Sequence, residues 1–203
     1  MPNASETTQP KTVSGRRTPV VTMSLSAVAI VMVYLSTFLF QLPIPSTQGY
    51  FNFGDIMIFT FAFTFGPVIG GISGAVGSSL SDALGGFGTF APFTFVIKGL
   101  EGLIAGLISH RRFKRRVLFG WVMGSVVMVA GYFLAESFFI SLVFGSSEFT
   151  GIVAASGEVP FNILQVVAGG LVGIPLSLAL KHLLKQTPYY YKLIETAISE
   201  KKI

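Results

Sequence analysis

The chain has 203 residues and a net charge of +5, yet only 11% of its residues are Asp, Glu, Lys or Arg, against about 25% in soluble domains. Apolar residues make up 51% of the sequence and the mean hydropathy is +0.71. These values exclude a soluble globular protein and a disordered one. The absence of cysteine excludes disulfides, thiolate nucleophiles and cysteine-based zinc sites.

The chain begins with a polar stretch, 1–18, which we expect to be a disordered cytoplasmic tail. Six apolar segments with few charges follow it, and a helix needs roughly 20 apolar residues to cross a hydrocarbon core. The predicted fold is an all-α integral membrane bundle of six transmembrane helices over 19–184, with a cytoplasmic tail over 185–203. The predicted spans are 19–41, 54–66, 67–84, 91–109, 117–144 and 158–184, of which the second and third are short and divided at Gly66-Pro67.

One part of the second span favours a strand instead of a helix. Its phenylalanines alternate with smaller residues from Phe59 to Phe65, and a period of two is typical of a β-strand. A membrane barrel needs many such alternating segments of about 10 residues, separated by turns. The other apolar segments are uninterrupted, so we predict a helix that turns aromatic surface toward both lipid and neighbouring helices.

The positions of the basic residues predict the orientation in the membrane. All Lys and Arg residues except Lys98 precede the first span, link the fourth and fifth spans, or follow the sixth. With six spans these three places lie on one side, which the positive-inside rule makes cytoplasmic, together with both termini. The loops on the other side, about 42–53, 85–90 and 145–157, contain no Lys or Arg. Beside a membrane the basic loop 110–116 fits anionic lipid better than nucleic acid.

Small residues recur at intervals of four in several spans. This spacing lets membrane helices approach closely, and we interpret it as a packing feature. No Lys-Ser/Thr pair follows these glycines, so they do not form a phosphate-binding loop. The positions are Gly66, Gly70, Gly74 and Ser78 in one row, and the pairs Gly102 with Gly106, Gly120 with Gly124, and Gly169 with Gly173.

Lys98 lies inside the fourth span, where a lysine costs roughly 2.5–3.5 kcal/mol to insert. Glu101 follows one turn later. Glu136 in the fifth span lies at a depth similar to that of Lys98, about 10 Å below the outer end, at a rise of about 1.5 Å per residue. Two interpretations stay open: Lys98 forms a purely structural ion pair with Glu101 or Glu136, or at least one of the three side chains contacts a ligand.

Other polar residues gather in the same outer half of the predicted bundle. Asp55 opens the second span, Asn162 and Gln165 lie in the first turns of the sixth, and the preceding outer loop contains Tyr50 and Asn52. The inner half is nearly all apolar or small, whereas an ion path needs ionisable groups across the full depth. The pattern predicts a ligand-binding cup open to the outside. For the outer loop, an interfacial aromatic belt with a helix cap at Asn52 or Asp55 is an equally open interpretation.

The sequence lacks the motifs that catalysis would need. It contains no G-x-S-x-G, no H-E-x-x-H and no Walker loop, and its two histidines, His110 and His182, fall at the cytoplasmic edge. We therefore predict that the protein is not an enzyme and that it holds neither a metal nor a cofactor.

Four stretches between residues 50 and 102 resemble the substrate-binding S component of energy-coupling-factor (ECF) vitamin transporters. The resemblance covers about residues 18–185 and is strongest with the riboflavin-type and hydroxymethylpyrimidine-type branch. In chain order the stretches are Tyr50-Phe-Asn-Phe-Gly-Asp55, Phe65-Gly-Pro-Val-Ile-Gly-Gly71, Gly77-Ser-Ser-Leu-Ser-Asp82 and Ala91-Pro-Phe-Thr-Phe-Val-Ile-Lys-Gly-Leu-Glu-Gly102. The resemblance implies a six-helix prokaryotic membrane protein that captures a vitamin or vitamin precursor with high affinity. Such proteins work with a transmembrane scaffold subunit and two ATPases, all separate chains.

The cup and the resemblance together give a set of expected contacts. The ligand, which is riboflavin, pyridoxine or a pyrimidine-like compound, is expected to lie under the 43–54 loop. S components typically present an Ala-x-x-x-Ala face of the first helix to the scaffold, and the nearest equivalent here is Thr22, Ser26, Ala27 and Ala29. The expected ligand contacts are the polar residues Asn52, Asp55, Lys98, Glu101, Glu136, Asn162 and Gln165, with Tyr50 and Phe93 as stacking surfaces.

Two other functions remain as alternatives. The first is a secondary transporter or channel for a small polar molecule that acts without partners. The second is a membrane assembly subunit without a ligand, in which the outer cup would be collapsed.

Overall fold

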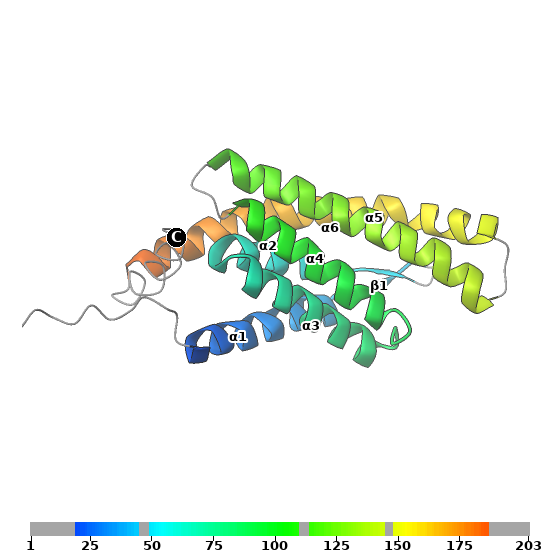
Figure 1. The fold of residues 1–203 in the computed structure, drawn as a ribbon, viewed down its shortest axis with the longest axis horizontal. Helices are drawn as coiled ribbons and strands as arrows, with labels where there is room; N and C mark the ends of the chain where they lie inside the picture. Colours follow the sequence, from blue (N-terminus) through cyan, green and yellow to red (C-terminus); the bar gives the residue numbers. More distant parts are fainter. Residues whose placement is uncertain (1–18, 45–48, 110–113, 145–147, 187–203) are drawn as a thin grey trace, which may run out of the picture.

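A computed structural model describes residues 19–44, 49–109, 114–144 and 148–186. These residues form six helices and one short pair of strands, and the helices run alternately up and down the long axis of the molecule (Figure 1). The elements are α1 (Pro19–Phe38), β1 (Leu42–Pro43), β2 (Tyr50–Phe51), α2 (Gly54–Phe65), α3 (Pro67–Gly85), α4 (Ala91–Ser109), α5 (Lys114–Phe144) and α6 (Glu148–Lys185). The predicted tail over 1–18, and the predicted tail over 185–203 beyond Gln186, lie outside the described residues.

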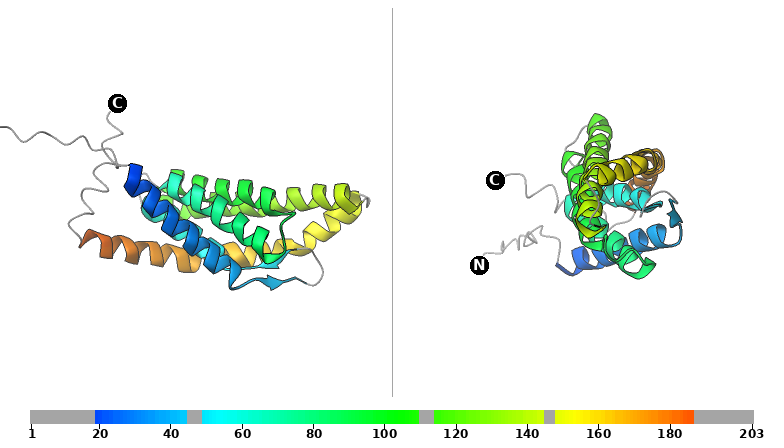
Figure 2. Two further views of the ribbon diagram at one scale, coloured as in Figure 1. Left: turned by 90° about the horizontal axis from the view of Figure 1, so that it is seen from below. Right: turned by 90° about the vertical axis from the view of Figure 1, so that its right-hand side faces the viewer.

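Each of the six predicted spans is a helix, and the largest difference lies at the start of α6. This helix begins at Glu148 instead of 158 and continues through Pro160 and Pro175. Proline lacks the N–H that helix hydrogen bonds need, so a helix that contains it bends. Figure 2 shows the change in direction along α6. Glu158, which the sequence placed at the helix start, therefore lies well inside the helix.

Within the described residues, four helices are long and apolar enough to cross a membrane: Val20–Phe38, Ala91–Ser109, Arg116–Phe138 and Gly151–Lys185. Their outer surfaces carry large apolar side chains such as Leu171, which is 71% exposed. A surface of this kind fits lipid and not water. The protein is therefore a mostly helical, multi-pass membrane protein.

The helix α2 lies at the centre of the bundle, where it contacts α1, α3, α4 and α6. The expectation that its phenylalanines also face lipid is wrong, because Phe59, Phe61 and Phe63 are buried. On a helix the period-two pattern places rings four residues apart on one face. Phe59 accordingly stacks on Phe63, and Phe61 on Phe65, with ring centroids 5.6 and 6.1 Å apart.

The turn between α2 and α3 falls at the predicted place, Gly66-Pro67. Gly66 has a φ of 97°, which favours glycine because a Cβ would be strained there. Pro67 follows as the first residue of α3, a position at which the missing N–H has no helical partner to lose. The two residues thus end one helix and start the next without an intervening loop.

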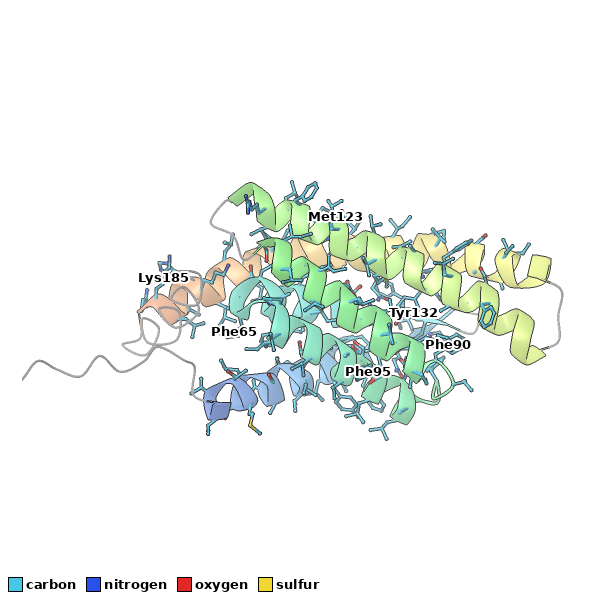
Figure 3. All side chains as sticks on the ribbon, in the orientation of Figure 1. Phe65, Phe90, Phe95, Met123, Tyr132 and Lys185 are labelled. Atoms are coloured by element: carbon cyan, nitrogen blue, oxygen red, sulfur yellow. The ribbon has the colours of Figure 1, made fainter. Side chains whose placement is uncertain are left out.

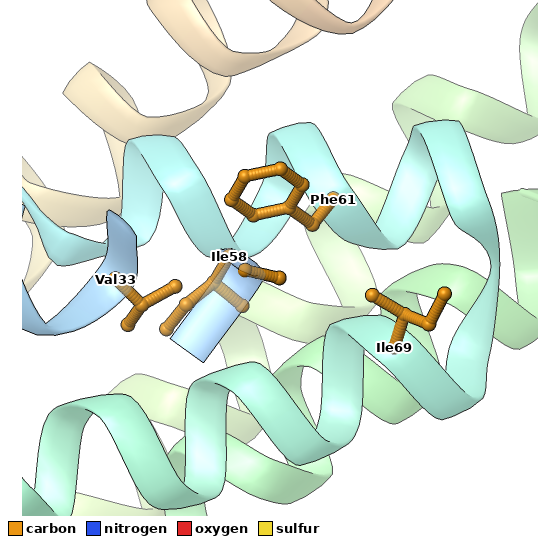
Figure 4. Close-up of a cluster of buried hydrophobic side chains, with 5 residues drawn as sticks. Val33, Ile58, Phe61 and Ile69 are labelled. Carbon is orange, nitrogen blue, oxygen red and sulfur yellow. The ribbon is translucent and has the colours of Figure 1, made fainter. Parts of the chain in front are cut away.

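The small residues bring α3 against α4 and α1, as their spacing predicted. A Cβ placed on Gly102 would overlap the backbone carbonyl of Gly70, and one on Gly74 would overlap that of Lys98. On its other side α3 meets α1, where a Cβ on Gly77 would lie 2.8 Å from the Ile30 carbonyl oxygen. Figure 4 shows the apolar cluster of α1, α2 and α3 that this close packing encloses, formed by Val33, Ile58, Phe61 and Ile69 with Ala29.

The two ends of the bundle hold different structural elements. One end, called the strand end here, holds β1, β2 and the α3–α4 loop, while α1 begins and α6 ends at the opposite end (Figures 1 and 2). In the strand pair, Leu42 lies opposite Phe51 and Pro43 opposite Tyr50. The turn between α2 and α3 lies at the opposite end, as do the end of α4 and the start of α5.

The contact between Gly102 and Gly70 gives a stability test. Gly102→Ala should destabilise the protein by about 1–3 kcal/mol, because the new methyl group has backbone atoms and no flexible side chain to displace. The measurement is the melting temperature in detergent. Gly88→Ala is the matched control, since its Cβ would lie 4.0 Å from the nearest atom, Ala83 Cα. Equal melting temperatures for the two variants would contradict the packing argument.

Candidate functional site

A pocket opens at the strand end, between the β2 region, the ends of α3 and α4, and turns inside α5 and α6. The space it leaves for a water-sized molecule is about 40 Å³, well below the roughly 300–1,000 Å³ of small-molecule sites, so a ligand of that size requires the walls to move apart. Aromatic rings, amides and carboxyl groups line it together. The lining residues are Gly49, Tyr50, Asn52, Asp82, Phe87, Phe90, Thr94, Tyr132, Glu136, Glu158, Asn162 and Gln165.

Gln165 joins the loop before α2 to the helix α6. Its Oε1 accepts hydrogen bonds from the backbone N and the Nδ2 of Asn52, at 3.1 and 3.2 Å. Asn52 Oδ1 in turn accepts a bond of 2.8 Å from the N–H of Gly54, the first residue of α2. The prediction of a helix cap at Asn52 or Asp55 is wrong, because the N-cap residue of α2 is Phe53 and it makes no side-chain cap hydrogen bond. Asn52 instead forms a local turn before the helix and lines the pocket.

Lys98 lies beneath the pocket in an ion-paired cluster with Asp55 and Glu101. Its Nζ donates to Asp55 Oδ1 and lies 3.2 Å from Glu101 Oε2. All three side chains are almost completely buried. Gln165 Nε2 donates to Asp55 Oδ2 at 3.2 Å and links the cluster to the pocket. The structural ion pair with Glu101 considered from the sequence is present, and Asp55 is a second partner that the sequence did not indicate.

Tyr132 stands between this charged cluster and the pocket. Its ring lines the pocket, and the Lys98 Nζ lies 5.6 Å from the ring centroid. The Tyr132 hydroxyl donates to Thr94 Oγ1 at 3.1 Å, which fixes the ring against α4. Figure 3 shows Tyr132 and Phe90 toward the strand end, and Phe65 and Lys185 toward the opposite end.

Tyr50 and Asp82 form the wall of the pocket at the end of α3. The Tyr50 hydroxyl donates to Asp82 Oδ1, and the Tyr50 ring packs on Phe87 with centroids 4.5 Å apart. Burial, together with the negative charge of Asp82, raises the pKa of the Tyr50 phenol well above its usual range. Tyr50 therefore remains a hydrogen-bond donor at any physiological pH.

Glu136 on α5 and Glu158 on α6 face each other in the pocket. They are 4% and 5% exposed and line the same pocket, where their charges repel each other. Glu136 was the other partner considered for Lys98, but both described ion pairs of Lys98 are with Asp55 and Glu101. Nearby, Asn162 lines the pocket, and its Nδ2 has no hydrogen-bond partner.

The structure divides the nine predicted contact residues into two groups. Tyr50, Asn52, Glu136, Asn162 and Gln165 line the pocket. The others lie outside its lining: Asp55, Lys98 and Glu101 in the buried cluster, and Phe93 packed against the apolar group of Ile97, Met128 and Val166.

Seven lining residues were absent from the predicted set. Asp82 was visible in the sequence as the charged end of the third span. The other six are Gly49, Phe87, Phe90, Thr94, Tyr132 and Glu158. Nothing in their local sequence sets them apart, because helix packing brings them to the pocket. A Cβ on Gly49, for example, would overlap the Glu158 carboxylate.

The four residues expected to meet a scaffold do not share one exposed face of α1. Ala27 is exposed and Thr22 partly exposed, whereas Ser26 and Ala29 are 8% and 0% exposed. Ala29 belongs to the core cluster with Val33 and Ile58, because that side of α1 packs on α2 and α3. In this conformation Ser26 and Ala29 are therefore inaccessible to a partner.

The ion-paired cluster predicts a large effect of removing its cation. Lys98→Met leaves Asp55 and Glu101 buried without a positive partner, which costs about 3–5 kcal/mol when one side of a buried pair is lost. The variant should melt well below the wild-type protein in detergent. Adding Asp55→Asn to Lys98→Met should recover part of the loss, because one unpaired carboxylate disappears. A Lys98→Met protein as stable as wild type would show that the cluster is not structural.

Solved structures include a chain with a similar fold. A structure reported as the S component of a bacterial ECF transporter superposes with a TM-score of 0.67, at 23% sequence identity, over 83% of this chain and 100% of that chain.

Three relatives match over most of their lengths. A Pyrococcus woesei protein described as an uncharacterized protein in the gap 3′ region is 43% identical over 73% of this chain and 94% of its own. The thiamine precursor transporter HmpT of Lactococcus lactis subsp. cremoris is 28% identical over 76% of this chain and 84% of its own. The riboflavin transporter RibU of Staphylococcus aureus is 26% identical over 80% of this chain and 89% of its own.

The family model described as the S component of ECF-type riboflavin transporters matches residues 18–182, from just before α1 almost to the end of α6. This range contains the whole described bundle except its last residues. The chain belongs to the family of ECF-type riboflavin transporter S components.

Proposed function

We propose that the pocket at the strand end binds the transported compound, and that this compound is riboflavin, pyridoxine or a pyrimidine-like vitamin precursor. One observation supports this most directly. In a bundle whose surface is apolar, aromatic rings and polar groups from β2, α3, α4, α5 and α6 converge on one pocket. A flat heterocycle needs such a combination, because the rings contact its faces and the polar groups bind its edges.

As a member of this family the protein is the membrane-embedded substrate-binding subunit of a vitamin-uptake system, and it is not an enzyme. The energy comes from a separate scaffold subunit and ATPases, as in ECF transporters generally. Two of the relatives are named as transporters, one of a thiamine precursor and one of riboflavin. These names support a vitamin or vitamin precursor for this chain.

In the proposed arrangement all six helices lie in the membrane, with both termini in the cytoplasm and the pocket facing outside. The starts of α1 and α5 and the end of α6 lie at one end, and the basic residues flank these points in the sequence. The positive-inside rule makes that end cytoplasmic. α2 has 12 residues and a length of about 18 Å, shorter than the bilayer core, and its position among other helices removes the need to span it alone.

The loop over 43–54 closes the pocket in this proposal. The contacts that connect its described residues to the walls include the Asn52–Gln165 pair, the Tyr50–Asp82 hydrogen bond and the packing of Tyr50 on Phe87. Opening these few contacts would admit a ligand without disturbing the helices beneath. The whole bundle then reorients when the scaffold couples ATP hydrolysis to it.

Contact with the scaffold is proposed for the outward face of α1 around Ala27. This side chain is exposed and small, and Met23, Val28 and Val31 around it are exposed and apolar. A small residue in an apolar helix face allows another membrane helix to approach closely.

The alternative is a secondary transporter that works without partners. Uptake into vesicles discriminates between the two, because the proposed S component needs scaffold and ATPase subunits with ATP. Accumulation by the purified chain alone would favour the alternative.

The ligand test begins with identification. Compounds extracted from the purified protein are identified by mass spectrometry, and the affinity of the compound found is measured by calorimetry. Asn162→Leu should weaken binding about tenfold, because it removes a buried donor that has no partner in the protein. The melting temperature without ligand should not fall. Unchanged affinity would exclude Asn162 from the site, and a protein without any bound or binding vitamin would contradict the function.

The scaffold contact is tested by adding bulk to α1. Ala27→Trp should abolish ATP-dependent uptake in vesicles that contain the complete transporter, while vitamin binding by the isolated chain stays unchanged, because the residue is exposed and does not line the pocket. Leu178→Trp, at a site on α6 that is 57% exposed, is the control and should transport normally. Normal uptake by the Ala27→Trp protein would rule out this face.

A further inference from the structure

The charges at the strand end are all negative. Asp82, Glu136 and Glu158 line the pocket, and none of the lining residues is Lys, Arg or His. The sequence agrees, since residues 39–53 after α1, residues 86–90 after α3, and residues 145–157, which include the first turns of α6, contain no basic residue. Lys98 of α4 does not line the pocket. It is paired with Asp55 and Glu101, and the Tyr132 ring separates it from the pocket.

The pair of Glu136 and Glu158 is incomplete without a further group. Two carboxyl groups that are buried in the lining of one pocket repel each other when both are ionised, so the site favours a shared proton, a cation or an N–H donor. No described residue forms an ion pair with either carboxylate. Glu136 Oε2 is buried and has no hydrogen-bond partner, which is costly for a charged acceptor.

Asn162 supplies a second unpartnered atom in the same pocket. Its side chain is 7% exposed, and its Nδ2 donor has no acceptor among the described residues. The pocket thus offers a free acceptor on α5 and a free donor on α6. A heterocycle edge that carries an N–H group next to a ring nitrogen or carbonyl would satisfy both.

A metal ion fits this pair less well. Within the described part of the chain, no group of three Asp, Glu or His side chains is arranged to hold a metal. The surrounding Tyr50, Phe87, Phe90 and Tyr132 rings instead provide flat apolar surfaces. Such rings pack against the face of a heterocycle and leave its edge for the polar groups.

We propose that this pocket selects a neutral or cationic nitrogen heterocycle that carries no phosphate or carboxylate, and that Glu136 and Glu158 bind its N–H edge. The inference rests on the proposed function, because it concerns the ligand of the same pocket. It adds a selection by charge: the phosphorylated form of a vitamin is excluded, and its dephosphorylated form is bound. A phosphate would be buried beside three carboxyl groups without a cation to pair with it.

The first experiment compares each compound with its own phosphate ester. Calorimetry on the full chain in detergent uses riboflavin, pyridoxine and hydroxymethylpyrimidine, and then the monophosphate of each. Whichever parent binds, its ester should bind at least about 100-fold more weakly, because like charges in a desolvated site repel strongly. An ester that binds as tightly as its parent overturns the charge selection and leaves the proposed function intact. Failure of all six compounds to bind would contradict the proposed function and this inference with it.

The second experiment asks whether the glutamate pair causes the selection. Glu158→Gln and Glu136→Gln keep the size of the side chain and remove its charge. Each should weaken binding of the parent compound about tenfold or more and should reduce the ratio between parent and ester affinities. The ratio distinguishes a ligand contact from a general loss of structure, which would lower both affinities alike.

Ser156→Ala is the matched control, since Ser156 lies near Glu158 on the same helix, is exposed and bonds only to the Ile152 carbonyl. It should leave both affinities unchanged. Glutamine variants that keep the wild-type ratio would overturn the assignment of Glu136 and Glu158. If either variant fails to fold, the comparison of parent and ester on the wild-type protein still decides the charge selection.

Discussion

The ammonium group of Lys98 fixes the relative positions of three helices in the centre of the bundle. It binds Asp55 at the start of α2 and Glu101 on its own helix α4, and Gln165 connects Asp55 to α6. In an apolar interior each of these charges would be costly alone, so the three side chains must stay together. Because Gln165 also accepts both hydrogen bonds from Asn52, the loop above α2 is positioned by the same cluster. The floor and one wall of the pocket therefore depend on a single buried cation.

The short length of α2 and the small residues of α3 explain why a pocket exists at the strand end. α2 begins only at Gly54, so the space above Asp55 is left to the β2 region and to side chains from the surrounding helices. At the opposite end Gly70, Gly102 and Pro67 bring the helices into backbone contact. Close packing at one end and a short central helix at the other thus place the pocket at the strand end.

The charges of the protein perform two separate tasks. Basic residues flank in the sequence the helix ends away from the pocket, and in the proposed arrangement they contact lipid headgroups and set the orientation. Acidic residues remain on the pocket side, where Tyr50 donates to Asp82 and Glu136 faces Glu158. No basic residue lines the pocket, and the nearby Lys98 is paired with Asp55 and Glu101 outside its lining. One uneven distribution of charge therefore accounts for both the proposed orientation and the proposed preference for ligands without negative charge.

The sequence by itself determined the helical segments, their boundaries near Gly66-Pro67 and the polar character of one end. These features depend on local properties: apolar length, proline and glycine geometry, and the positions of charges along the chain. Five of the nine predicted contacts line the pocket for the same reason, because polar residues stand out in an apolar segment. Only the tertiary structure decided that Asp55 binds Lys98, that Glu136 faces Glu158 and that Tyr132 separates the two groups. Those pairings join residues far apart in the chain, and they depend on how each helix is rotated and packed, which spacing along a single segment does not encode.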